Sequence, residues 1–388
     1  MAIDTERHLW TVAALSASCH DALICSSASE VLLLTGYWPV MAQSVAIFSS
    51  DGGVKVIVPE DEVELAEKTS LAEIIPYKPA GLHSLEGPLN RLKEPLRCAL
   101  QGWFAPKMRI GLELVEGMQP ASYAVSAVFR SSLSKLVGEL EPEATLASCD
   151  DLLEAMKAVK TTKELEILHT ASDVAAAGFA VAAMGIGAGR RETDVAAETR
   201  AAFETSRDGQ NLQRSYGYYF CMSGPNSATA AAAYARTRQR VIEAGDLVMI
   251  HANTCADGYW TDITRTYSAG VQSSRQREMR SAIDEARAAG LRSIKPGATA
   301  KEVDHAARSV MDSAGFGKAF KHAAGHGVGF AAANSNGRPR LHPLSPDVLE
   351  EGMTFNLEPA AYFEGYGGMR HCDVITVTPE GASVITDF

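Results

Sequence analysis

The arrangement of apolar residues changes near residue 155, and this change predicts a chain of two domains. Before it, short apolar runs alternate with segments of helical spacing. After it, longer helical segments are separated by pairs of strands. We therefore predict an N-terminal domain over residues 1–155 and a second domain over residues 156–388. The length of 388 residues fits this division, because soluble domains commonly contain about 150 residues.

The first 155 residues predict a sheet covered by helices. Helical spacing occurs over residues 6–17 and 123–139. Short apolar runs and strand-like segments occur at residues 22–25, 31–34, 44–48, 54–58, 109–114 and 144–148. The third and fourth of these segments are joined by Asp51-Gly52-Gly53, which has the composition of a hairpin turn. Alternation of this kind indicates an α/β domain.

The second domain is expected to contain long helices and an antiparallel sheet. Thr161-Thr162-Lys163-Glu164 matches a capping box and predicts the start of a helix through residues 171–183. Further helices are predicted over residues 152–159, 192–206, 274–293 and 300–313, and strands over residues 247–252, 259–267, 354–357 and 373–378. Because these strands meet in hairpins, the sheet is expected to be largely antiparallel, which makes the whole chain an α/β (α+β) protein.

Composition excludes several functional classes. Lys and Arg number 36 and Asp and Glu number 47, which gives a net charge of −11. An acidic chain without basic runs repels phosphate backbones, so we expect no nucleic-acid partner. Uninterrupted apolar stretches such as residues 181–186 are shorter than the roughly 18 residues that cross a bilayer, and the acidic start lacks the features of a signal peptide. Seven scattered cysteines without a Cys-x-x-Cys pair indicate reduced thiols. Together with the short apolar stretches and the acidic start, they lead us to expect a cytoplasmic protein that binds no membrane.

Two segments of the second domain carry histidines at positions that favour metal binding or catalysis. His251 and Asp262 lie on the two strands of a predicted hairpin, where their side chains are expected side by side. His326 projects from the glycine-lined segment 322–329, in which the backbone approaches another group closely. Each residue alone is more often structural than a ligand.

Two later segments add acidic, basic and thiol groups. Glu358 ends a predicted strand, and Arg370 and Cys372 are two residues apart and therefore share one face of another strand. A single cysteine of this kind is more often a small buried apolar residue. The four segments taken together favour one functional site.

The order and spacing of these segments resemble the pita-bread family, which contains aminopeptidase P, prolidase, methionine aminopeptidase and creatinase. The resemblance lies in residues 33–37 of the first domain and in residues 223–226, 245–251, 261–266, 325–329, 357–359 and 367–373 of the second. It implies an N-terminal creatinase-like α/β domain, a C-terminal pita-bread catalytic domain with a curved, mostly antiparallel sheet, and a homodimer.

The resemblance also implies site residues. Metallopeptidases of this family bind two ions with two aspartates, one histidine and two glutamates; the corresponding positions here are His251, Asp262, His326, Glu358 and Cys372. A histidine thus replaces the first aspartate and a cysteine replaces the last glutamate. The implied catalytic residues are His322, Glu358, Arg370 and Tyr234, and the implied substrate-binding residues are His322, Arg370 and Tyr234. Tyr234 and Ala333 stand at positions where the peptidases have histidines.

The two replacements change the metal chemistry that we expect. Manganese prefers carboxylate oxygens, whereas a mixed set of His, Asp, Glu and Cys suits zinc or iron. We predict one zinc or iron ion held by Asp262, His326 and Glu358, with His251 or Cys372 as the fourth ligand. Manganese, or no ion at all, are the alternatives.

Three hypotheses of function follow. The first is a metal-dependent hydrolase of carbon–nitrogen bonds that resembles Xaa-Pro dipeptidase or aminopeptidase P and acts on a dipeptide or another small molecule. The second is a metal-independent hydrolase of a small amide or amidine, similar to creatinase or ectoine hydrolase, in which a histidine is the base or Cys372 the nucleophile. The third is a non-catalytic binding protein on the same fold.

Overall fold

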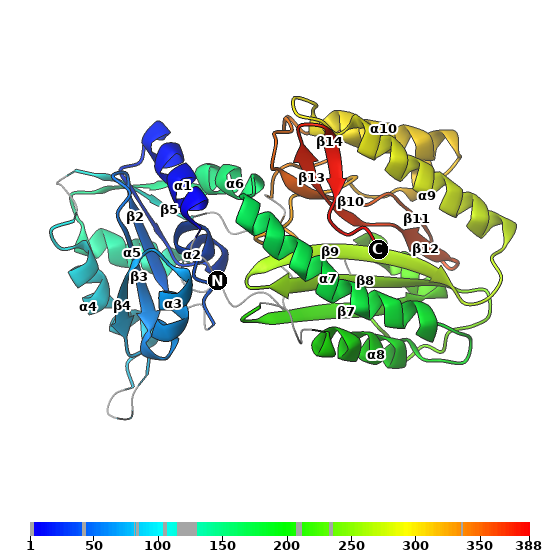
Figure 1. The fold of residues 1–388 in the computed structure, drawn as a ribbon, viewed down its shortest axis with the longest axis horizontal. Coiled ribbons are helices and arrows are strands. Elements are labelled where there is room, and N and C mark those ends of the chain that lie inside the picture. Colours follow the sequence, from blue (N-terminus) through cyan, green and yellow to red (C-terminus); the bar gives the residue numbers. More distant parts are fainter. Residues whose placement is uncertain are drawn as a thin grey trace. The chain divides into compact units, whose positions relative to one another are not determined.

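The computed structural model describes residues 4–40, 44–80, 82, 85–103, 107–114, 130–206, 212–232, 236–334 and 337–388. The chain forms two compact units, Met1–Lys157 and Ala158–Phe388, each with its own sheets and core (Figure 1). Tyr234 and residues 123–129 of one predicted helix lie outside the described residues.

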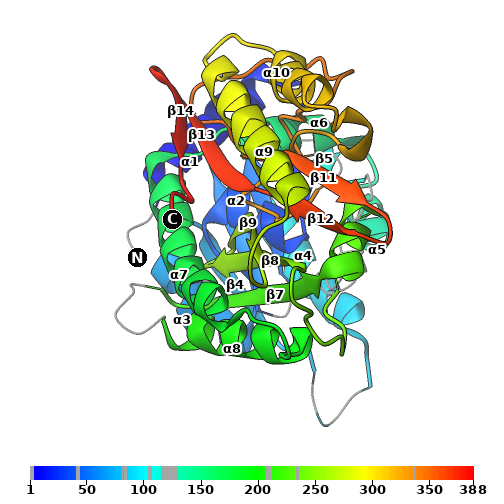
Figure 2. The same cartoon turned by 90° about the vertical axis from the view of Figure 1, so that its right-hand side faces the viewer.

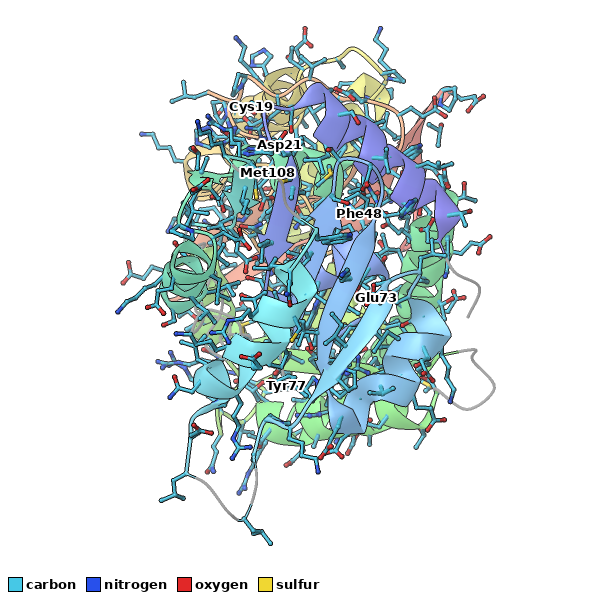
Figure 3. All side chains as sticks on the ribbon, turned by 90° about the vertical axis from the view of Figure 1, so that its left-hand side faces the viewer. Cys19, Asp21, Phe48, Glu73, Tyr77 and Met108 are labelled. Atoms are coloured by element: carbon cyan, nitrogen blue, oxygen red, sulfur yellow. The ribbon has the colours of Figure 1, made fainter. Side chains whose placement is uncertain are left out.

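The first unit is built on a mixed six-stranded sheet with the order β4-β3-β2-β1-β5-β6. The strands are β1 (Ala22–Cys25), β2 (Val45–Ser49), β3 (Val54–Pro59), β4 (Glu73–Tyr77), β5 (Arg109–Leu112) and β6 (Thr145–Ser148). The predicted hairpin is present, because β2 and β3 pair antiparallel around residues 50–53. β1 pairs antiparallel with β2 and parallel with β5. Glu73 and Tyr77 mark the two ends of the edge strand β4 (Figure 3).

Helices cover this sheet. They are α1 (Thr5–Ala17), α2 (Ala28–Thr35), α3 (Val63–Thr69), α4 (Pro88–Leu100) and α5 (Arg130–Leu140); the 3-10 turn η1 (Glu60–Glu62) precedes α3, and α6 (Asp150–Ala158) follows β6. Phe48 of β2 lies beneath α1, with its ring 5.4 Å from that of His8 (Figure 3). The apolar run 31–34 lies in α2, which ends at Gly36 in the left-handed conformation. A short helix buried on all sides gives the same apolar run as a buried strand.

The helices of the second unit pack in two layers. They are α7 (Thr162–Gly185), α8 (Glu192–Thr205), α9 (Ser274–Ser293) and α10 (Ala300–Ser313), with the 3-10 segments η3 (Gly224–Ala232) and η4 (Gly317–Ala319). Thr161 and Glu164 form the predicted capping box of α7. By length and composition alone α7 could cross a membrane, although core helices pass the same test. In this unit α7 buries Leu168, Val174 and Phe179.

Three small antiparallel sheets complete the second unit. One contains β7 (Ser215–Ser223), β8 (Leu247–Ala256) and β9 (Tyr259–Ser268); another contains β10 (Thr354–Leu357), β13 (Asp373–Thr378) and β14 (Gly381–Val384); the third contains β11 (Ala360–Phe363) and β12 (Gly367–Arg370). α7 and α8 cover one face of the first sheet, while α9 packs against β11, β12 and β14 (Figure 2). Single bridges join Thr264 to Cys372 and Gly327 to Phe355, and so connect the segments that the sequence singled out.

Candidate active site

The β8–β9 hairpin turns over Asp257 and Gly258, which both have a positive φ, as a two-residue hairpin turn requires. This turn sets a register in which His251 faces Thr264 and Asp262 faces Asn253. His251 and Asp262 therefore lie side by side, as expected, although they are not a directly paired couple. They are diagonal neighbours on one face, with His251 Nδ1 3.5 Å from Asp262 Oδ1.

The segment 322–329 approaches β10 as closely as its glycines suggested. A Cβ atom at Gly325 would collide with the carbonyl oxygen of Asn356. The main-chain N–H of Asn356 donates to the carbonyl of His326 over 2.9 Å, and that of Glu358 donates to Ala324 over 2.8 Å. His326 is thereby held beside the end of β10.

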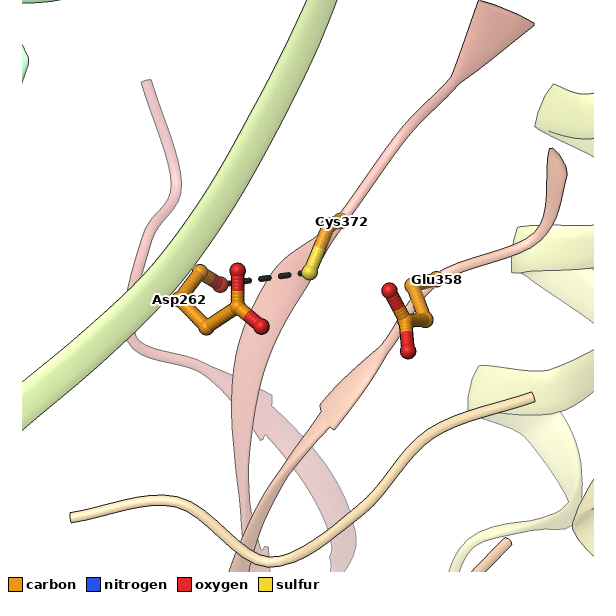
Figure 4. A group of neighbouring side chains, drawn as sticks. All are labelled: Asp262, Glu358 and Cys372. Atoms are coloured by element: carbon orange, nitrogen blue, oxygen red, sulfur yellow. Dashed lines mark hydrogen bonds between the residues drawn. The ribbon is translucent and has the colours of Figure 1, made fainter. Parts of the chain in front are cut away.

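Asp262, Glu358 and Cys372 face one another (Figure 4). One ligand atom from each lies within 4.8 Å of the other two, and all three residues are buried. The Cys372 thiol donates to the main-chain carbonyl of Asp262 over 3.2 Å. Asp262 Oδ1 is buried without a hydrogen-bond partner. A buried carboxylate oxygen without a donor is costly unless a cation faces it.

His326 stands beside this group. Its Nε2 atom is 3.5 Å from Asp262 Oδ2 and 3.9 Å from Glu358 Oε1. Burial lowers the pKa of His326, but the interaction with Asp262 and the charge of Glu358 outweigh burial and raise the pKa to about 9. The two carboxylates therefore attract positive charge, which either a proton on His326 or a metal ion can supply.

His251 is turned toward a different partner. Its Nδ1 atom is 2.9 Å from Arg370 Nη2 and 3.0 Å from Thr264 Oγ1. A guanidinium only donates, so Nδ1 accepts and the ring proton lies on Nε2. Burial is the largest of the effects that lower the pKa of His251 to about 4, and the ring stacks on Phe220. Neither nitrogen of this neutral ring offers a free lone pair to an ion.

Arg370 and His322 lie at the other side of Glu358. Arg370 Nη1 is 3.5 Å from Glu358 Oε2, and Arg370 Nε donates to Thr264 Oγ1 over 3.0 Å. His322 has Nδ1 2.8 Å from the carbonyl of Ala323 and Nε2 3.0 Å from the hydroxyl of Tyr362. Nδ1 therefore carries the proton and Nε2 accepts from the tyrosine. Burial lowers the pKa of His322, which keeps this ring neutral.

Sequence reasoning did not identify three residues that contact this cluster, namely Thr264, Asn356 and Tyr362. Thr264 lies in the segment 261–266 that carries the resemblance but was given no role, and no charge, motif or spacing marks Asn356 or Tyr362. The donor set itself fits one divalent ion. Zinc binds carboxylates, thiolates and imidazoles, and all three kinds of group are present here. Asp262 Oδ1 has no hydrogen-bond partner, so this oxygen is available to coordinate the ion.

Comparisons with known proteins agree with this arrangement. Residues 166–379 match the sequence model of metallopeptidase family M24. The Xaa-Pro dipeptidase of Pyrococcus furiosus is 33% identical over 237 residues, which cover 61% of this chain and 65% of the length of that dipeptidase. A probable dipeptidase, PepE, of Mycobacterium tuberculosis is 32% identical over 273 residues, covering 69% of this chain and 68% of the relative. The solved structure of the prolidase from Pyrococcus furiosus has a TM-score of 0.76 at 26% identity and covers 97% of this chain and 99% of its own.

Proposed function

This chain belongs to metallopeptidase family M24, and from that premise we propose that it hydrolyses Xaa-Pro dipeptides with a single zinc or iron ion. The observation that carries the proposal is the convergence of Asp262, Glu358 and Cys372, whose ligand atoms lie within 4.8 Å of one another. The names of the similar dipeptidases support the substrate class.

In this proposal the ion is held by Asp262, Glu358 and Cys372, and His326 completes the set after a small movement of its ring. A thiolate and an imidazole favour zinc or iron over manganese. When bound, the ion polarises the scissile carbonyl and lowers the pKa of a water molecule toward 7. His251 remains outside the ligand set, because Arg370 and Thr264 occupy its Nδ1 atom.

The remaining catalytic roles belong to the protein groups around the ion. Glu358 accepts a proton from the attacking water, and Arg370, 3.5 Å away, keeps that carboxylate beside a positive charge. His322 and Arg370 orient the dipeptide, and the guanidinium of Arg370 stabilises the negative charge that develops on its carbonyl oxygen. Tyr234 is proposed to contact the substrate as well. The half-buried ring of Phe220, which stacks on His251, offers an apolar surface for a side chain of the substrate.

The experiment that tests this function measures hydrolysis of Gly-Pro and Ala-Pro before and after removal of metal. The purified enzyme is treated with chelator, dialysed, and assayed with zinc, iron or manganese added back. We expect activity to disappear on chelation and to return with zinc or iron. A Glu358→Gln variant should lose at least 100-fold in kcat, because its amide accepts no proton. Full activity after exhaustive removal of metal would contradict the proposal.

One observation favours a second function. Arg370 contacts Glu358, and the raised pKa of His326 lets that ring carry the second positive charge, so the two carboxylates are neutralised without an ion. Such a pocket would suit the hydrolysis of a small amide or amidine by acid–base chemistry, as creatinase-like enzymes perform it. Turnover of such compounds that chelators leave unchanged would favour this function.

The proposal also includes a homodimer in the cytoplasm. Light scattering at concentrations from micromolar downward measures the first property, and fractionation of cells measures the second. If the protein is a monomer at all concentrations, the proposed homodimer is wrong, while the proposed reaction is unaffected.

A further inference from the structure

Asn356 connects two segments of the site that are far apart in the sequence. It lies on β10, fully buried, and its main chain pairs with Val374 of β13. Its main-chain N–H donates to the carbonyl of His326 over 2.9 Å, and its side-chain Oδ1 accepts from the main-chain N–H of His326 over 2.7 Å. Residue 356 thus holds residue 326 through two reciprocal hydrogen bonds.

These bonds decide which way the amide of Asn356 points. Because Oδ1 must face an N–H donor, the two N–H groups of Nδ2 face the opposite direction. There Nδ2 lies 3.1 Å from Asp262 Oδ2 and 3.1 Å from His326 Nε2. One side chain therefore contacts the carboxylate from β9 and both the backbone and the ring of the histidine from the segment 322–329.

The contact with Asp262 determines which oxygen of that carboxylate is available. Oδ2 accepts from Asn356, whereas Oδ1 is buried and has no hydrogen-bond partner. The free oxygen belongs to the carboxylate that faces Glu358 and Cys372. The ring of His326 is fixed at its other edge, with Nδ1 3.1 Å from the carbonyl of Gly327.

We propose that Asn356 is a positioning residue that holds the carboxylate of Asp262 and the main chain at His326 in the arrangement that an ion requires. This inference rests on the proposed metal-dependent function. An amide suits the position because it supplies one acceptor and two donors at once. Asp would oppose the carboxylate of Asp262, and a β-branched apolar residue would leave Asp262 Oδ2 and the main-chain N–H of His326 without their partner. Groups that orient ligands in this way typically contribute 10- to 100-fold to metal affinity.

The test compares Asn356→Val with Asn356→Thr, two variants of the same shape that differ by one hydroxyl. Zinc affinity is measured by competition with a chromophoric chelator, and thermal unfolding is measured without metal. Asn226→Val is the matched control, because it removes another buried amide, which donates to Glu192. We expect Asn356→Val to bind zinc 10- to 100-fold more weakly than the wild type. Asn356→Thr should lie between the two, and Asn226→Val should keep the wild-type affinity while its melting temperature falls.

Wild-type zinc affinity in a folded Asn356→Val variant would overturn the inference while leaving the proposed function intact. If Asn356→Val does not fold, Asn356→Thr decides, and an affinity equal to that of the wild type overturns it. A similar loss of affinity in Asn226→Val would also overturn it, since the effect would then follow stability alone. If the wild type itself binds no zinc or iron, the proposed function fails, and the inference fails with it.

Discussion

Arg370 donates a hydrogen bond to Nδ1 of His251 over 2.9 Å, which makes the histidine a partner of the arginine. The same guanidinium lies 3.5 Å from Glu358. His251 therefore fixes the direction of a positive charge that faces the proposed proton acceptor. Residue 251 could act as a metal ligand or as a group that orients Arg370, and this hydrogen bond distinguishes the two roles.

We predict that His251→Leu leaves the zinc content unchanged and lowers kcat/KM for Gly-Pro by about 10-fold or more, because Arg370 loses its acceptor. Elemental analysis and steady-state kinetics on the same preparation measure both effects. Loss of zinc in parallel with activity would show that His251 is a ligand, as the sequence suggested.

Cys372 is predicted to set the choice of metal. Cys372→Ser replaces a soft donor with a hard one, so zinc affinity should fall at least 10-fold while manganese affinity changes less. Cys221→Ser is the control, since this thiol is also buried but packs in the apolar core beneath α7 and α8. Competition titrations with both metals give the result. Equal losses for zinc and manganese would argue against a thiolate ligand.

Zinc binding at neutral pH is predicted to release protons. The neighbouring carboxylates raise the pKa of His326 to about 9 despite its burial, and burial raises the pKa of the Cys372 thiol well above its usual value. Both groups must lose a proton to bind an ion, so about two protons should leave at pH 7, and affinity should rise with pH, steeply up to about 9 and less steeply above it. Calorimetry in buffers of different ionisation enthalpy counts these protons. A count near zero would contradict the assignment of both ligands.

A separate prediction concerns the first unit. Burial is the main cause that raises the pKa of Glu113 to about 7, with the charge of Glu30 adding to it. Because the folded-state pKa exceeds the unfolded one, the contribution of Glu113 to stability is complete below pH 4.5 and is lost as the pH rises to about 7. The loss amounts to about 3 kcal/mol at most. Glu113→Gln should remove this pH dependence in thermal unfolding between pH 4.5 and 8. A constant difference between the two proteins would contradict it.

The fold class was predictable because most of its elements carry local signals. The capping box at Thr161 and Glu164 marks the start of α7, and the hairpin between β2 and β3 follows from Asp51-Gly52-Gly53. The expected α/β fold and the resemblance to the pita-bread family are confirmed. The apolar run of α2 was expected as a strand, since a helix buried on all sides lacks helical periodicity, and β7 was not predicted.

The site was predictable in its segments but not in its contacts. The described structure brings His251, Asp262, His326, Glu358, Arg370 and Cys372 together. The diagonal register of His251 and Asp262 depends on a two-residue turn, and the roles of Asn356 and Tyr362 depend on hydrogen bonds that spacing does not reveal. The metal-ligand and catalytic roles of these residues stay predictions.

The most direct test of a single-ion hydrolase is the metal content per chain. The protein is purified without added metal or nickel resin, and elemental analysis is repeated after incubation with zinc, iron and manganese. We predict about one zinc or iron per chain, lost in a double variant that replaces Asp262 and Glu358 with Ala. Two manganese ions per chain, or no metal under any condition, would contradict the account.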